Sequence, residues 1–271
     1  MTNPGRGRST PEEEGLFLEA IKVGDLVRIR QMVQDDRDLL FINEAYYGSP
    51  VRAATDSQYP DVADYLARVM LQRLREDTIP DNRLYGAIHD LGEAAHSTTG
   101  FRGCDNLRAE AEPIVAGFLT HNNAQLRYIA VSVLSAHWDL RRYAGAFQQM
   151  SLNDSEDDVR QIALSSVGWL LRSTKDRDAT RFLLSIFRDL GQDTSMRQTA
   201  YEGLVEVWQG SNAATSVFVR MRRIEHPLGA KSRAGEEDKG IGSESRTEKV
   251  WEDVVDWEFV LEVEEELKNR T

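Results

Sequence analysis

Residues 156–163, with the sequence EDDVRQIA, contain the motif whose repetition decides the fold. An apolar residue is followed by Arg, two variable residues and Ala, and this order occurs at 126–130 (LRYIA), 159–163 (VRQIA) and 196–200 (MRQTA). From Arg127 to Arg160 is 33 residues, and from Arg160 to Arg197 is 37. A structural unit repeated at this period is typical of stacked helix pairs. The sequence therefore predicts an all-α protein, a solenoid of antiparallel helix pairs.

A polar turn and an apolar helix precede each copy of the motif. The first helices of the pairs are expected at 107–119, 141–152 and 179–190, and the turns before the motif supply Asn, Asp or Ser for helix caps. This arrangement resembles HEAT repeats, whose Asp-x-x-Val-Arg-x-x-Ala motif is almost complete at 156–163. The resemblance implies a right-handed solenoid over residues 77–224, with the second helix of each pair lining the concave wall.

Residues 15–76 resemble a pair of ankyrin repeats. Residues 16–25 are similar to the first helix of such a repeat and its Gly-Asp turn, and a second helix is expected at 26–33. Residues 48–54 (GSPVRAA) are similar to the Gly-x-Thr-Pro-Leu-His-x-Ala signature, but Ser49, Val51 and Arg52 replace Thr, Leu and His. Residues 60–66 repeat the turn-plus-helix pattern. A further helix is expected at 83–95, followed by a loop at 97–103.

The two ends of the chain differ in composition from the repeats. Residues 1–14 are polar and predict disorder up to a helix start near Pro11, and residues 225–249 predict a flexible linker. An incomplete helix is expected at 217–224. The acidic amphipathic segment 250–271 fits two patterns: Trp257, Phe259, Leu261 and Val263 alternate as in a strand, whereas Val250, Val254, Trp257 and Leu261 form a helical stripe. The all-α context favours the helix.

The bulk composition limits the class of protein. Of 271 residues, 41% are hydrophobic and 29% charged, no apolar run is long enough to span a bilayer, and the N-terminus lacks the apolar core of a secretory signal. The single cysteine, Cys104, predicts a cytoplasmic protein without disulfides. The net charge of −12 argues against nucleic-acid binding and favours a basic protein partner, unless the acidity only maintains solubility. We expect no membrane association, and a monomer when the chain is alone.

Helical rotation of about 100° per residue assigns the faces of each second helix. One face, with small residues such as Ala130, Ala163 and Ala200, packs within the pair, and an apolar flank packs on the next pair. The last flank, formed by Tyr201, Val205 and Trp208, needs a cover. The remaining outward face is either a solvated surface or a recognition surface, and the tryptophans of the acidic segment extend it. These candidate binding residues are Tyr128, Ser132, Asp139, Gln161, Arg172, Gln198, Glu202, Gln209, Trp251 and Trp257.

The arginines of the motif are expected to form structural ion pairs with neighbouring acids. The chain contains no phosphate-binding loop, nucleophile elbow or zinc-protease motif. His89, Glu93 and His96 share one helix face, but we expect a solvated face there, with no metal and no cofactor.

The sequence thus predicts a non-enzymatic, protein-binding solenoid, specifically an inhibitor or immunity-type protein that neutralises a basic partner. A general adaptor or assembly scaffold is the alternative within this class. An enzyme of the HEAT-like kind, such as a chromophore lyase or a DNA glycosylase, is the alternative outside it.

Overall fold

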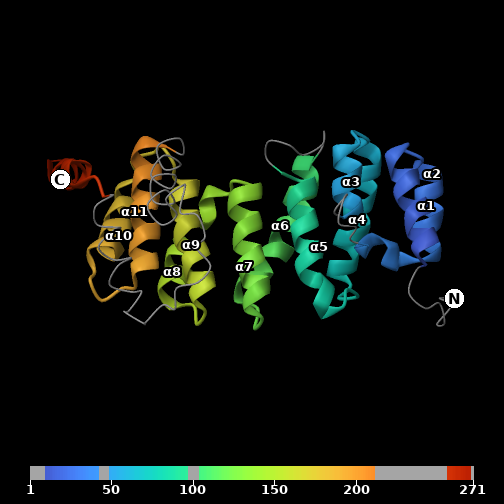
Figure 1. Cartoon of the computed structure of the whole chain (residues 1–271), viewed down its shortest axis with the longest axis horizontal. Helices are drawn as coiled ribbons and strands as arrows, with labels where there is room; N and C mark the ends of the chain where they lie inside the picture. The colour runs from blue at the N-terminus through green and yellow to red at the C-terminus, as the bar shows by residue number, and fades with distance from the viewer. Residues whose placement is uncertain (1–9, 43–48, 97–103, 211–254, 270–271) are drawn as a thin grey trace, which may run out of the picture. The chain divides into compact units, whose positions relative to one another are not determined.

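Every regular element in the described parts of the chain is a helix (Figure 1). The structure is a computed structural model and describes residues 10–42, 49–96, 104–210 and 255–269. These residues belong to two compact units, unit 1 within residues 1–140 and unit 2 within residues 141–271. The all-α class is confirmed. The expected loop 97–103, helix 217–224 and linker 225–249 lie outside the described residues.

Helix α1 (Pro11–Lys22) begins where local side-chain chemistry favours a helix start. The hydroxyl of Thr10 accepts a hydrogen bond from the Glu13 amide at 3.3 Å, and the Glu13 carboxylate accepts one from the Thr10 amide at 2.9 Å. This reciprocal capping box, followed by Pro11, satisfies amides that the first helical turn leaves unpaired. The expected helix start near Pro11 is confirmed, and the boundary of disorder at residue 14 is wrong because 11–14 form the first turn.

The remaining helices of unit 1 stack in two layers. Helix α1 packs on α3, α3 on α5 and α5 on α7, while α2 packs on α4 and α4 on α6. Contacts between next-but-one helices are what stacked helix pairs produce. The elements of this unit after α1 are α2 (Leu26–Asp35), η1 (Arg37–Phe41), α3 (Pro50–Asp56), α4 (Pro60–Arg75), α5 (Asp81–Ala94), α6 (Cys104–Gly117), η2 (Phe118–Thr120), α7 (Ala124–Ser132) and the π-helical turn η3 (Val133–His137).

In unit 2, two long helices lie against each other through glycines. Helix α8 packs on α9, α9 on α11 and α11 on α10. A Cβ atom at Gly168 would lie 2.5 Å from the Cα atom of Gly203, so α9 and α11 touch through their backbones. The expectation that small residues allow close helix approach is confirmed. The elements of this unit are η4 (Arg141–Tyr143), α8 (Ala144–Asn153), α9 (Asp157–Leu170), α10 (Arg177–Arg188), α11 (Thr194–Gln209) and α14 (Trp257–Asn269).

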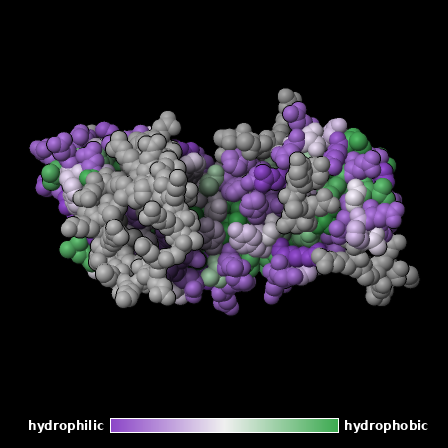
Figure 2. All heavy atoms as spheres, in the orientation of Figure 1, coloured by the Kyte–Doolittle hydropathy of each residue, from purple (hydrophilic) through white to green (hydrophobic). Residues whose placement is uncertain are grey.

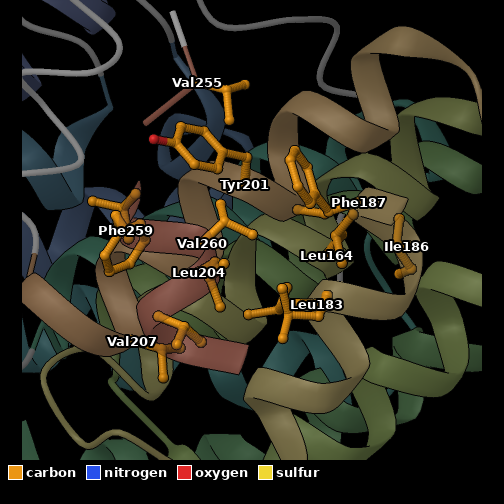
Figure 3. Close-up of a cluster of buried hydrophobic side chains, with 14 of the residues drawn as sticks. Leu164, Leu183, Ile186, Phe187, Tyr201, Leu204, Val207, Val255, Phe259 and Val260 are labelled. Atoms are coloured by element: carbon orange, nitrogen blue, oxygen red, sulfur yellow. The ribbon is translucent and has the colours of Figure 1, made fainter. Parts of the chain in front are cut away.

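Helix α14, red in Figure 1, covers the last apolar flank of the repeats. Val260 and Val263 are fully buried in one cluster with Tyr201 and Val205, as Figure 3 shows for the labelled members Val260 and Tyr201. Trp208 packs against the edge of this cluster. The expected helix is confirmed over residues 257–269, and the flank that needed a cover has one.

The register expected for α14 is wrong. Trp257 is 40% exposed and Leu261 is 59% exposed, so neither the strand alternation nor the predicted helical stripe describes the buried face. The inward positions of the helix are instead Phe259, Val260 and Val263, with Leu267 partly buried. Val260 and Phe259 lie three and four positions before Val263, which is the spacing of one helix face.

The three motif arginines cap the ends of the preceding helices. Arg127 donates to the carbonyl oxygens of residues 121 and 122, Arg160 to that of residue 154 and Arg197 to that of residue 187. A cation near a helix C-terminus satisfies free carbonyls and opposes the negative end of the helix dipole. Arg160 also forms an ion pair with Asp157. The expected ion pair is therefore present at Arg160, and the carbonyl contacts that all three arginines make were not expected.

Candidate functional site

Within unit 2, five of the predicted binding residues lie on α9, α11 and the turn after α9. Gln161 and Gln209 are exposed, whereas Arg172, Gln198 and Glu202 are half-buried. The Gln161 amide donates to the Thr199 hydroxyl at 3.3 Å, so the two helices share a polar contact on this face. The predicted residues of this unit therefore include both solvent-facing and partly covered side chains.

Arg172 does not lie on the helix that was expected to carry it. Helix α9 ends at Leu170, and the Arg172 guanidinium folds back over the Trp169 ring at 4.8 Å from the ring centroid. It also donates to the Trp169 carbonyl oxygen at 2.7 Å. The rotation of 100° per residue cannot place a side chain beyond the last helical turn. Arg172 thus caps α9 from a position beyond its last helical turn.

Glu206 is a half-buried acid on α11 that the sequence analysis missed. Its carboxylate lies close to α9, since a Cβ atom added to Gly168 would be 3.2 Å from Oε2 of Glu206. Burial raises the pKa of Glu206 to about 7; the nearby Glu202 acts in the same direction and Arg172 opposes it. The four-residue spacing of Glu202 and Glu206 is visible in the sequence. The burial of Glu206 by α9 is not, because it depends on the contact between Gly168 and Gly203.

Unit 1 contributes Tyr128, Ser132 and Asp139, all of them half-buried. The regular helix ends at Ser132, and a π-helical turn follows, closed by a hydrogen bond of 3.0 Å from the Trp138 amide to the Val133 carbonyl oxygen. Asp139 lies after this turn in the left-handed region, with φ of 52°. Its predicted position on a helical wall is wrong, because the wider turn breaks the rotation on which the prediction relied.

The exposed face of α14 combines apolar and acidic side chains. Leu261 lies with the exposed residues Glu258, Glu262 and Glu265 at the spacing of one helix face. Trp257 begins this helix, and Trp251, the other predicted tryptophan, lies outside the described residues. The described surface at the α14 end of the view is mainly hydrophilic, with isolated hydrophobic residues (Figure 2). We call Trp257, Glu258, Leu261, Glu262 and Glu265 the α14 face.

Local contacts hold Trp257 in place. Its ring centroid lies 5.6 Å from that of Phe187, and the Arg188 guanidinium lies 5.2 Å from it. Arg188 also donates two hydrogen bonds, of 3.0 and 2.8 Å, to one carboxylate oxygen of Glu264. Arg188 is therefore engaged beside the tryptophan by Glu264, and the three glutamates of the α14 face are exposed.

Three histidines and one glutamate meet in unit 1. His89 and Glu93 lie one turn apart on α5, and His137 approaches them from η3. The ring centroids of His89 and His96 lie 5.5 and 5.4 Å from that of His137. The structure brings His89 and Glu93 together as their spacing indicated, with His137 rather than His96 completing the close set. His137 lies 44 positions after Glu93, and no local sequence signal connects them.

Burial and charge act differently on the two closest histidines. Interaction with Asp90 raises the pKa of His89, and burial lowers the pKa of His137 despite the attraction of Glu93. Burial also raises the pKa of Asp90, which His89 and Ser49 oppose. Burial thus favours the neutral form of His137, the form that can bind a metal ion, whereas Asp90 favours the charged form of His89.

No family model matches the chain, and neither a curated protein nor a solved structure matches it. None of the described helices has both the length and the apolar character needed to cross a membrane.

Proposed function

We propose that the chain is a non-catalytic α-solenoid that binds a basic protein through the α14 face. The solenoid would be right-handed, with ankyrin-like pairs over 15–76 and HEAT-like pairs over 77–224. The two-layer packing in unit 1 and the paired packing of α8 to α11 in unit 2 support this architecture. Such scaffolds present extended surfaces to macromolecules.

The observation that carries the proposal is the composition of the α14 face. Trp257 and Leu261 are exposed apolar residues, and three exposed glutamates accompany them. Tryptophan is enriched among the interface residues that contribute most to binding energy. Negatively charged residues around such a residue favour a positively charged partner and increase the rate of association. The net charge of −12 adds a longer-range attraction of the same sign. A basic protein surface with an apolar recess fits this face.

An inhibitor or immunity-type role is the form of binding we favour. A compact acidic protein that covers the basic surface of an effector would also block that effector's access to acidic substrates. An adaptor would use the same face without loss of the partner's activity. The two roles are separated by assaying the partner's own activity with and without the chain.

The experiment is co-purification from native extract with the full chain as bait. The variant Glu258→Gln/Glu262→Gln/Glu265→Gln removes three charges from the α14 face. A matched control, Glu12→Gln/Glu19→Gln/Asp61→Asn, removes three exposed charges from unit 1 and leaves the same net charge.

We expect a basic protein to be retained by the wild type and by the control, and to be released by salt and by the α14 variant. Trp257→Ala should weaken retention even at low salt, because it removes the apolar anchor rather than a charge. Equal retention by the two triple variants would show that net charge alone governs binding. Retention of an acidic partner, or of no protein, would refute the proposal.

A further inference from the structure

Three donor atoms in unit 1 lie close enough to share one ion. The Oε1 atom of Glu93 is 3.4 Å from Nδ1 of His137 and 3.9 Å from Nε2 of His89. All three ligand atoms lie within 4.8 Å of one another. A tetrahedral zinc ion with bonds of about 2.0–2.1 Å holds its donor atoms about 3.3 Å apart. Small side-chain rotations therefore suffice to bring the set to coordination distances.

The buried Nδ1 atom of His137 is the second argument for a bound ligand. This atom makes no hydrogen bond of good geometry, although it faces the Glu93 carboxylate at 3.4 Å and the Gly92 backbone lies close to the ring. Buried polar atoms in folded proteins almost always have a partner, so an exception needs a cause. A metal ion between this nitrogen and the carboxylate would satisfy both groups at once.

Backbone features place His137 against α5. A Cβ atom at Gly92 would lie 2.7 Å from the Val133 side chain and 3.2 Å from Nδ1 of His137, so only glycine allows this approach. The π-helical turn η3 sets the direction from which His137 arrives. Such turns occur frequently at functional sites. The cluster thus depends on two local departures from regular helix packing.

A buried carboxylate lies behind one of the ligands. Asp90 is 8% exposed, and its Oδ1 atom faces Nδ1 of His89 at 3.8 Å, on the opposite side of the ring from Nε2. Metal-binding histidines commonly direct their second nitrogen to a carboxylate, which fixes the tautomer and the ring orientation. Asp90 would take this role after a slight approach, and it leaves Nε2 of His89 for the metal.

We propose that His89, Glu93 and His137 bind a divalent transition-metal ion through Nε2, Oε1 and Nδ1, and that zinc is the preferred ion. Two imidazoles and one carboxylate suit zinc, whereas calcium and magnesium require mainly oxygen ligands. The fourth position is taken by water or by His96. The site is independent of the α14 face, since it lies entirely within unit 1.

The test uses the full chain without an affinity tag, stripped with a chelator and dialysed. Zinc binding is measured by isothermal titration calorimetry and by elemental analysis after gel filtration, and Co²⁺ replacement reports the coordination from its visible absorption. The variants are His89→Gln and Glu93→Gln, with Asp90→Asn for the carboxylate behind His89. The control is His121→Gln, which alters an exposed histidine outside the cluster. Circular dichroism confirms the helical fold of each.

We expect one zinc ion per chain, a higher melting temperature with zinc, and the absorption of four-coordinate Co²⁺. His89→Gln and Glu93→Gln should abolish stoichiometric binding, Asp90→Asn should weaken affinity roughly 10-fold to 100-fold, and His121→Gln should leave it unchanged. Absence of stoichiometric zinc on the folded wild type would overturn the proposal. So would unchanged affinity in both His89→Gln and Glu93→Gln.

Discussion

Glu206 makes the stability of unit 2 depend on pH, and the variant Glu206→Gln tests this directly. The carboxyl is half-buried where α11 meets α9, and burial raises its pKa to about 7 from an ordinary value of 4.5. Each pKa unit corresponds to about 1.4 kcal/mol, so the full effect is about 3 kcal/mol. The folded unit holds the proton to higher pH than the unfolded chain does. Stability therefore falls as pH rises from about 4.5 to 7 and is lowest above that range.

Glutamine has nearly the same shape as the protonated acid and does not ionise. We expect Glu206→Gln to change the free energy of unfolding little at about pH 4 and to raise it by up to about 3 kcal/mol at about pH 8. Urea denaturation of both proteins at the two pH values measures the difference. Tryptophan fluorescence reports unfolding through Trp169 and Trp208 in unit 2 and Trp138 in unit 1, and the fitted slope checks that the same transition is compared.

The control is Glu265→Gln, which removes one exposed charge from the α14 face and should change the free energy of unfolding little. Glu202→Gln removes a repulsive neighbour and should lower the midpoint of the pH effect without abolishing it. The reasoning is refuted if Glu206→Gln shifts stability equally at both pH values. A wild-type stability that rises between about pH 5 and 7 in step with Glu206 ionisation would refute it as well.

Three further changes test the packing. Gly92→Ala should cost about 1–3 kcal/mol of unfolding free energy and weaken zinc binding, because its methyl group would overlap the facing turn; thermal denaturation and calorimetry measure both. Gly168→Ala should cost about 3 kcal/mol or more because it meets backbone, whereas Gly145→Ala, in open space on α8, should be neutral or stabilising in the same urea assay. Deletion of 225–271 should lower stability and increase acrylamide quenching of Trp208; unchanged quenching would mean that α14 is not its cover.

The helical regions were predictable because pattern and capping agree there. Helix α11 follows Asp193, whose carboxylate accepts a hydrogen bond from the Met196 amide at 2.8 Å, and it ends at Gly210 in the left-handed region. Both signals are local and readable. The helix expected at 179–190 instead runs from Arg177 to Arg188, because Asp176 caps its start. Leu190, the expected last residue of this helix, lies beyond its end and is 79% exposed.

The candidate sites were less predictable because they depend on contacts between distant segments. The spacing of His89 and Glu93 on one helix is a local property, and it was visible. The position of His137 next to His89 and Glu93 depends on the glycine at position 92 and on a π-helical turn. Neither feature produces a periodic pattern in the sequence. The burial of Glu206 likewise requires that α9 and α11 touch at Gly168. Composition alone could not place these contacts.

The register of α14 shows how one distant hydroxyl can decide between equivalent patterns. The segment has apolar residues on more than one face, so its periodicity alone does not select the buried face. The Tyr201 hydroxyl accepts a hydrogen bond from the Asp256 amide at 2.9 Å, and the Asp256 carboxylate accepts one from the Phe259 amide at 3.0 Å. These two bonds place the helix start at Trp257 and turn Val260 toward α11. Leu261 must then face solvent beside the glutamates, so the contact that completes the core also creates the face proposed to bind a partner.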